Sequence, residues 1–268
     1  MFSVPDTAPE ENKAICALVN KGLNPKQLYK AAYTFYRFSL EQALMRQPPI
    51  RVQTGLFKGM VLFPGSLGSQ LLPKWLGTYE AEVQTLLSTH ARNASCFINI
   101  GCAEGFYLSG IAQWLQIPCF GTDLDPRSQQ AVQHSAAHNA LSHLVQFCPS
   151  TQDAVARASG NLLCLVDVDG NELAVLNELQ QWLPTNQNIH TISLILETDR
   201  DTHGQHNTPV LIDWLCAHGW QVQTIAQQNP HLRFEGLLSD QSFLDQVAHG
   251  AEGRPGGQAW IFATQTRG

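Results

Sequence analysis

Short apolar runs alternate with longer stretches of helical periodicity through most of the chain. From residue 96 onward, runs rich in Ile, Leu, Val and Phe are each bounded by Gly, Pro or Asp, and most are followed by a stretch with apolar positions at helical spacing. This alternation predicts a mainly parallel sheet with right-handed crossovers. The expected strands are 96–100, 118–123, 144–148, 161–168, 191–197, 220–226 and 259–265, and the expected helices are 105–115, 126–140, 172–183 and 209–218. The long segment 229–257 before the last strand is expected to cover a ligand and to hold a further helix that starts at Ser239 and ends at Gly250.

The first 77 residues follow a different pattern, which predicts an N-terminal helical extension before a domain over 78–268. Asn24 followed by Pro25 is typical of a helix start, and the helix is expected to run to about Arg46. Its aromatic residues lie almost all round the helix, which favours packing on its own core, with a homodimer contact as the alternative. Residues 50–78 predict a short β-hairpin and a loop, and Thr78 is expected to cap the next helix.

Composition narrows the class of protein. Hydrophobic residues make up 44% and charged residues 14%, so a substantial core is expected. The net charge is −6 and no run of Lys and Arg interleaves with aromatics, which predicts no nucleic-acid partner. No apolar run approaches a membrane span, so no membrane partner is expected. Seven cysteines without a CxxC pair, and no signal peptide, favour a reducing, cytoplasmic location.

The turn after the first of these strands carries the candidate chemistry. Gly101, Cys102, Ala103, Glu104 and Gly105 follow the apolar run and precede a helical stretch. The middle glycine of a dinucleotide fingerprint is absent, which disfavours close approach of a pyrophosphate to the backbone. No Gly-Lys-Ser/Thr follows, so a Walker-type phosphate-binding loop is not expected. This pattern disfavours a nicotinamide-dependent oxidoreductase and predicts a ligand without phosphate.

A carboxylate after the second strand indicates a nucleoside. Asp123 lies 22 positions after Gly101, where an acidic side chain can accept hydrogen bonds from both ribose hydroxyls. Asp125 precedes Pro126 and is expected to cap the following helix instead.

Four segments together resemble class I S-adenosylmethionine-dependent methyltransferases. They are "INIGCAEGFY", "GTDLDP", "LVDVDGNELAVL" and "LILETD", and the last two are similar to the FkbM-type group. The resemblance covers about 78–227 and implies a Rossmann-like α/β fold with a seven-stranded, mostly parallel sheet whose last strand is antiparallel. It implies S-adenosyl-L-methionine as cofactor, bound by Asn99, Gly101, Cys102, Glu104, Gly105, Asp123, Asp167 and Asp169.

The sequence departs from that pattern at three places. Asn99 replaces an acidic residue, and Glu104 is a candidate to compensate for the lost charge. Asp169 stands where the group has a glutamate. The histidine that follows the final glutamate is replaced by Thr198.

The methyl acceptor should meet groups at the carboxyl ends of the later strands. Glu197, Asp167 and His203 are the candidate catalytic residues, although a solvated His203 is an alternative. The candidate substrate-binding residues are Tyr79, Glu80, Glu172 and Arg254. Glu172 could instead favour its helix dipole, and Arg254 could be a surface residue.

No metal is expected. Asp199, Asp201, His203 and His206 form a conceivable ligand set, but loop spacing alone does not fix their geometry. The sequence thus predicts a methyltransferase that acts on oxygen or nitrogen of a small-molecule acceptor. The alternative is a non-catalytic module that binds the cofactor without transfer.

Overall fold

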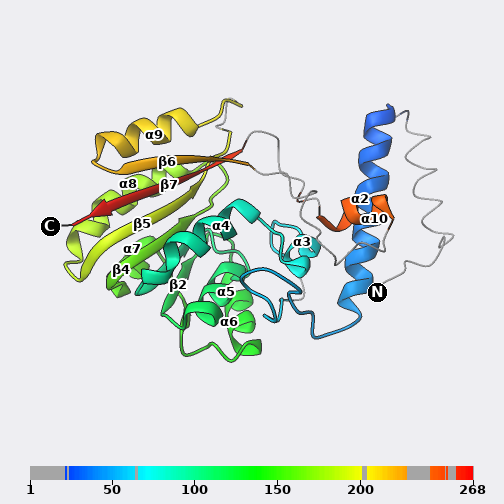
Figure 1. Cartoon of the computed structure of the whole chain (residues 1–268), viewed down its shortest axis with the longest axis horizontal. Coiled ribbons are helices and arrows are strands. Elements are labelled where there is room, and N and C mark those ends of the chain that lie inside the picture. Colours follow the sequence, from blue (N-terminus) through cyan, green and yellow to red (C-terminus); the bar gives the residue numbers. More distant parts are fainter. Residues whose placement is uncertain are drawn as a thin grey trace.

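A seven-stranded sheet forms the centre of the computed structural model, which describes residues 22, 24–63, 66–200, 204–227, 242–250, 252 and 258–267 (Figure 1). Within these residues the strand order is β3-β2-β1-β4-β5-β7-β6, with β7 antiparallel to both of its neighbours and the other pairings parallel. The predicted fold class is therefore confirmed. The strands are β1 Cys96–Ile100, β2 Cys119–Thr122, β3 Val145–Phe147, β4 Gly160–Val166, β5 Ile189–Glu197, β6 Gln221–Ala226 and β7 Ala259–Thr266.

Both faces of the sheet are covered, which is why its central strands read as continuous apolar runs. Alternate residues of a strand point to opposite faces, so Phe97 joins one core cluster while Ile98 joins the other. The first cluster lies under α4 Ala81–His90, α5 Phe106–Leu115 and α6 Ser128–His138. The second lies under α7 Thr151–Arg157, α8 Glu172–Trp182 and α9 Thr208–Ala217.

The N-terminal part packs on the same core as the sheet. Helix α2 (Pro25–Met45) begins at the predicted Asn24 cap, but only Leu40 and Leu44 in its last turns are buried. In the following segment Phe57 lies against Gly110 of α5, where an added Cβ would come within 2.6 Å of the Phe57 ring. The first core cluster therefore draws residues from both sides of the proposed domain boundary.

One helix here has no counterpart in the sequence prediction, and a second, near the C-terminus, was expected. Helix α3 (Leu71–Leu76) lies in the stretch expected to be a loop, and the expected β-hairpin is reduced to an isolated bridge between Arg51 and Val61. Helix α10 (Phe243–Gly250) lies beside α2, away from the sheet (Figure 1). Its expected cap, Ser239, lies outside the described residues.

Most other differences between the sequence prediction and the structure concern where helices begin. Helix α4 begins after Glu80 rather than at Thr78, because Glu80 adopts a left-handed backbone with a φ of 45°. Helix α7 was not expected from the sequence. In the structure Ser150 caps it, and the Ser150 side chain accepts a hydrogen bond from the Asp153 amide. That Ser-x-x-Asp spacing is a recognised start signal and could have revealed the helix.

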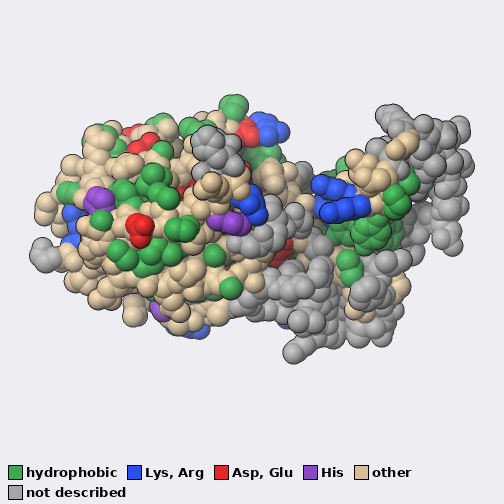
Figure 2. Space-filling model, turned by 90° about the horizontal axis from the view of Figure 1, so that it is seen from above, with side chains coloured by type: hydrophobic (Ala, Val, Ile, Leu, Met, Phe, Trp, Pro, Cys, Tyr) green, Lys and Arg blue, Asp and Glu red, His purple; other side chains and the backbone are tan. Residues whose placement is uncertain are grey.

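The described surface includes an apolar area on α2. Tyr29 is 65% exposed and Phe38 is 55% exposed, and Figure 2 shows hydrophobic side chains gathered at this end of the molecule. No helix among the described residues is long and apolar enough to cross a membrane.

Candidate functional site

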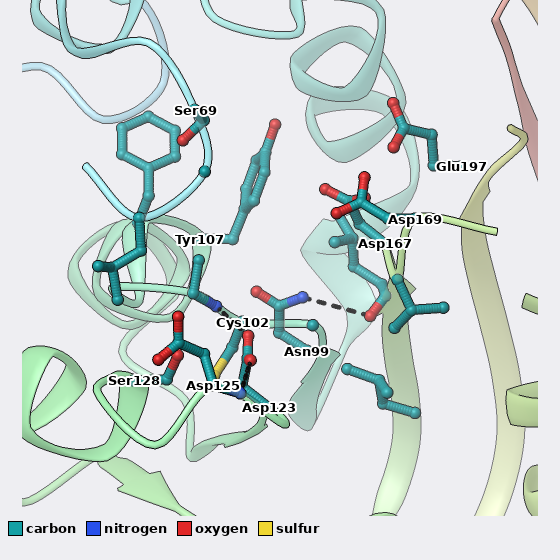
Figure 3. A pocket seen from close by; sticks show the side chains of 18 of the residues that line it. Ser69, Asn99, Cys102, Tyr107, Asp123, Asp125, Ser128, Asp167, Asp169 and Glu197 are labelled. Carbon is teal, nitrogen blue, oxygen red and sulfur yellow. Dashed lines mark hydrogen bonds between the residues drawn. The ribbon is translucent and has the colours of Figure 1, made fainter. Parts of the chain in front are cut away.

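A cavity of about 760 Å³ opens at the carboxyl ends of the parallel strands. This is the edge of the sheet where α/β folds bind ligands. Figure 3 shows that Asp123 and Ser128 lie toward one end of it, while Glu197 and the hydroxyl of Tyr107 lie toward the other. Of the residues predicted from the sequence, the cavity is lined by Tyr79, Glu80, Asn99, Gly101, Cys102, Glu104, Asp123, Asp167, Asp169 and Glu197.

The two glycines of the turn have different roles. Gly101 has a φ of 79°, and an added Cβ would lie 1.7 Å from the carbonyl oxygen of Asp167. Glycine is therefore required there because the end of β4 approaches the turn. Gly105 has a φ of 82° and its Cβ would meet Val132 of α6. Gly105 does not line the cavity, so its expected place in the cofactor site is corrected to a packing position at the start of α5.

Backbone amides donate hydrogen bonds to both carboxylate oxygens of Asp123. Its Oδ2 accepts a hydrogen bond of 2.7 Å from the amide of Ala103, in the glycine turn, and its Oδ1 accepts one of 2.7 Å from the amide of Asp125. Each carboxylate oxygen can accept a second hydrogen bond. The side chain is thus oriented and still has acceptor capacity toward the cavity.

Asp125 does not cap the helix as the sequence predicted. Helix α6 begins at Ser128, and the Asp125 carboxylate instead accepts hydrogen bonds from the amide and the guanidinium of Arg127. The guanidinium and the Arg127 amide lower the pKa of Asp125 to about 2.

Asn99 is buried at the end of β1 and bridges to the neighbouring strand. Its side chain is 2% exposed, and Nδ2 donates to the carbonyl oxygen of Leu165 in β4 at 3.4 Å. An ionised carboxylate could not donate this hydrogen bond. The side-chain amide of Asn99 therefore bonds to the neighbouring strand β4, and its Oδ1 remains a hydrogen-bond acceptor at the cavity wall.

Glu104 is held by a buried lysine that the sequence analysis did not identify. Lys74 of α3 forms an ion pair with Glu104, and it also donates to Ser69 Oγ at 2.5 Å. The amide of Leu67 donates to the second Glu104 oxygen at 3.1 Å. The charge of Glu104 is neutralised by this network, so the structure corrects the expectation that it compensates for Asn99.

The far end of the cavity combines aromatic rings with buried carboxylates. The Tyr107 hydroxyl donates to Glu80 Oε2 at 2.5 Å, and the Glu80 amide donates to Glu252 Oε1 at 2.9 Å. Burial, followed by the carboxylates of Glu80 and Asp167, raises the pKa of Tyr79 well above its ordinary value. Burial and Glu80 raise the pKa of Tyr107 in the same way. Both phenols therefore keep their protons at neutral pH.

Glu172, a candidate substrate-binding residue, also does not line the described cavity. Glu172 is fully buried outside it, where the Gly170 amide and the Asn207 side chain donate to its two oxygens. Its substrate-binding role is corrected to a cross-link between the loops that follow β4 and β5. His203 and Arg254 lie outside the described residues.

No metal-binding cluster of His, Cys, Asp or Glu occurs among the residues that the structure describes. The set proposed from the loop after β5 includes Asp201 and His203, which lie outside those residues. Asp199 instead accepts hydrogen bonds from the Arg200 amide and from Gln258.

Several lining residues were not predicted, and most of them come from segments without a recognised motif. They are Ser69, Lys74, Tyr107, Ser128, Glu252 and Gln258. A lone lysine in the apolar stretch "LLPKWL" is an unusual position for a charge and could have singled out Lys74. The long connection before β7 was expected to cover a ligand, and Glu252 belongs to it.

Comparisons with known proteins give distant similarities in structure only. No protein-family model and no curated protein matches the sequence. The methyltransferase domain of METTL16 is 15% identical, with 85% of this chain and 79% of that chain covered and a TM-score of 0.47. TrmK of M. capricolum, solved with S-adenosyl-homocysteine, is 9% identical, with 68% and 67% covered and a TM-score of 0.45. The M1A22 tRNA methyltransferase TrmK of B. subtilis is 7% identical, with 68% and 64% covered and a TM-score of 0.45.

These identities and scores are low, so the fold is assigned from the strand order and the function is inferred from the cavity. One earlier expectation is nevertheless wrong. The absence of a basic run was taken to exclude a nucleic-acid partner, yet the similar structures include a protein described as a tRNA methyltransferase. The pattern of basic residues therefore does not exclude a nucleic-acid substrate for a chain of this fold.

Proposed function

We propose that the protein is a class I methyltransferase that uses S-adenosyl-L-methionine. The observation that carries the proposal is the position of Asp123, held by the amide of the glycine turn at the end of β2 with acceptor capacity toward the cavity. The finer resemblance to the FkbM-type group rests on the segments 165–176 and 194–199 and is part of the same proposal.

The residues around Asp123 fit a nucleoside. Ser128 Oγ is fully buried, lines the cavity and has no hydrogen-bond partner among the described residues. A buried hydroxyl without a partner is costly and suits a polar ligand atom. The cavity volume of about 760 Å³ is also within the range of roughly 300–1,000 Å³ typical of sites for molecules of this size.

In this proposal each end of the cavity binds a different part of the reacting pair. Asp123 accepts hydrogen bonds from the two ribose hydroxyls, and Asn99 and Asp167 bind the methionyl amine. When bound, the cofactor supplies a methyl group activated by a positively charged sulfur. Tyr79, Tyr107 and Glu197 lie at the acceptor end, where they align the nucleophile and exclude water. Alignment and desolvation are the main requirements of an in-line displacement.

Calorimetry with S-adenosylmethionine and S-adenosylhomocysteine tests the proposal. The wild-type protein should bind both, and Asp123→Ala should weaken binding by roughly tenfold to a hundredfold, the usual effect of losing hydrogen bonds to a charged group. Asp213→Ala removes an exposed carboxylate on α9 and serves as the matched control. No binding by the wild type, or equal binding by Asp123→Ala, would refute the proposal.

A second candidate function is a non-catalytic module that binds the same cofactor. The neutral Asn99 and the Glu104 charge held by Lys74 favour it, because both reduce the negative charge available to a sulfonium. It predicts cofactor binding without turnover. Transfer of a labelled methyl group from S-adenosylmethionine to any component of the producing cell's extract would reject it, provided that Asp123→Ala abolishes the transfer.

A further inference from the structure

A buried glutamine in the cavity wall has an open hydrogen-bond acceptor. Gln258 lines the cavity and is 6% exposed, and its Oε1 has no hydrogen-bond partner among the described residues. A buried polar atom without a partner is costly, so an acceptor in a cavity wall suits a ligand that pairs with it. An amide oxygen can only accept, so that ligand must bring an N–H or O–H group.

The amide of Gln258 is oriented by the loop that follows β5. Its Nε2 donates to Oδ1 of Asp199 at 3.4 Å. An ionised carboxylate only accepts, so this contact fixes which end of the amide faces Asp199. The adjoining backbone is held as well, because the Thr198 amide donates to the carbonyl oxygen of Ala259 at 3.0 Å. Gln258 therefore presents an acceptor whose direction is set before a ligand arrives.

Three aromatic rings line the same cavity. Tyr79, Phe106 and Tyr107 are each 9% exposed or less. Phe106 packs edge-on against the two tyrosines, with ring centroids 5.7 Å and 5.3 Å apart. Figure 3 shows the Tyr107 hydroxyl and Glu197 toward one end of the cavity, and Glu197 lies two positions before the Asp199 that holds Gln258. The aromatic wall and the open acceptor thus belong to the acceptor end.

The hydroxyl protons of both tyrosines are engaged by one carboxylate. The Tyr107 hydroxyl donates to Glu80 Oε2 at 2.5 Å, and the Tyr79 hydroxyl is also hydrogen-bonded to Glu80. The two side chains therefore offer the cavity mainly the apolar surface of their rings. Such surfaces favour another aromatic ring, in edge-on or offset arrangements with centroids about 4.5–7 Å apart.

A negatively charged group is disfavoured inside the cavity. Lys74 and Arg127 are its lysine and arginine among the described lining residues. Each is already ion-paired, Lys74 with Glu104 and Arg127 with Asp125. Neither cation remains to bind a carboxylate or a phosphate, so the group that enters beside Gln258 should carry no negative charge.

We propose that the methyl acceptor enters the cavity as an aromatic ring with an N–H or O–H donor, and that Gln258 selects it by accepting that hydrogen bond. This inference rests on the proposed methyltransferase function and specifies its acceptor. The ring packs against the aromatic wall, and its donor reaches Oε1 of Gln258. Gln258 binds and orients the acceptor and exchanges no proton with it. A small phenol and a nucleobase with an exocyclic amine share this chemistry.

The first experiment measures binding to the full chain saturated with S-adenosylhomocysteine, by calorimetry. Phenol is compared with anisole, and adenosine with dimethyladenosine, in which methyl groups replace both hydrogens of the exocyclic amine. In at least one pair the donor-bearing probe should bind roughly tenfold more tightly, the order expected for one hydrogen bond to a buried acceptor. The pair that shows the preference distinguishes a small phenol from a nucleobase. Equal binding within both pairs, or no binding of any probe, would overturn the proposal.

A variant separates the hydrogen bond from the bulk of the added methyl groups. Gln258→Met keeps an unbranched side chain and removes the amide oxygen. It should weaken binding of the donor-bearing probe roughly tenfold and leave its methylated partner and S-adenosylhomocysteine unchanged. A purely structural role of Gln258, through its bond to Asp199, would instead weaken both probes of a pair. A preference that persists in Gln258→Met would overturn the proposal.

Gln180→Met is the matched control. It makes the same change at an exposed position of α8 that does not line the cavity, and it should leave every affinity unchanged. Loss of the preference in this variant as well would overturn the proposal, because the effect would not come from the cavity.

The two proposals fail in different ways. If the wild type does not bind S-adenosylhomocysteine, the proposed function fails and the acceptor proposal fails with it. If it binds S-adenosylhomocysteine but shows no preference for a donor-bearing probe, only the acceptor proposal fails.

Discussion

Lys74 of α3 and Glu104 of the glycine turn form an ion pair in which the two side chains are only 4% and 6% exposed. The pair joins the N-terminal part of the chain to the cavity. Lys74→Met should lower the free energy of unfolding by about 3–5 kcal/mol, because it leaves the Glu104 carboxylate buried without its cation. Urea unfolding followed by circular dichroism measures the loss.

A double variant separates the pair from the general packing of Lys74. Lys74→Met with Glu104→Gln removes both charges and should recover most of the lost stability. Lys26→Met, at an exposed position of α2, is the control and should have little effect. If the double variant is less stable than Lys74→Met, charge burial is not the cause.

Gly101 should tolerate no side chain. Gly101→Ala adds a Cβ that would lie 1.7 Å from the Asp167 carbonyl oxygen, so β1 and β4 must separate at the cavity. Gly59→Ala is a matched control, since Gly59 has a φ of 87° and nothing within 4 Å of an added Cβ. Gly59→Ala should lower the free energy of unfolding by about 1–2 kcal/mol, because a side chain is disfavoured in a left-handed backbone. Gly101→Ala should lower the free energy of unfolding by clearly more than Gly59→Ala and should abolish cofactor binding. Thermal unfolding measures both variants, and equal losses of stability would contradict the close approach of Gly101 to Asp167.

Glu172 should make stability fall as the pH rises. Burial raises the pKa of this carboxyl above its ordinary value, against the hydrogen bonds from Gly170 and Asn207. The folded state therefore holds the proton more tightly than the unfolded chain, so its contribution is complete below the unfolded pKa of about 4.3 and decreases as the pH rises through the folded pKa. The difference in unfolding free energy between wild type and Glu172→Gln should decrease over this range. A difference independent of pH would contradict the prediction.

Tyr36 should fix α10 against α2. Its hydroxyl donates to Asp245 of α10, and burial together with this bond raises the pKa of Tyr36 to about 12, so the phenol stays protonated at neutral pH. Tyr36→Phe should speed amide hydrogen exchange in α10 by roughly tenfold, as expected for the loss of one hydrogen bond. Tyr29→Phe alters a tyrosine that is 65% exposed and should leave exchange unchanged. Unchanged exchange in Tyr36→Phe would show that apolar packing alone holds the helix.

The sequence by itself determined the sheet and one side of the cavity. Apart from Asn99 and Asn161, residues 96–100 and 161–166 are apolar because both faces of β1 and β4 are covered, so the strands could be located without tertiary information. The glycine turn and Asp123 are set by local backbone geometry at strand ends, and both line the predicted edge of the sheet.

Only the tertiary structure decided which charges remain available in that cavity. Glu104 and Glu172 are alike in the sequence as acids near strand ends. The structure separates them, because Lys74 neutralises the first and hydrogen bonds from Gly170 and Asn207 hold the second outside the cavity. Glu80 and Glu252, 172 positions apart, are joined by a hydrogen bond from the Glu80 amide to the Glu252 carboxylate. Hydrophobic periodicity reports which face of an element is buried. The partner of a buried charge comes from a distant segment, and only folding brings the two together.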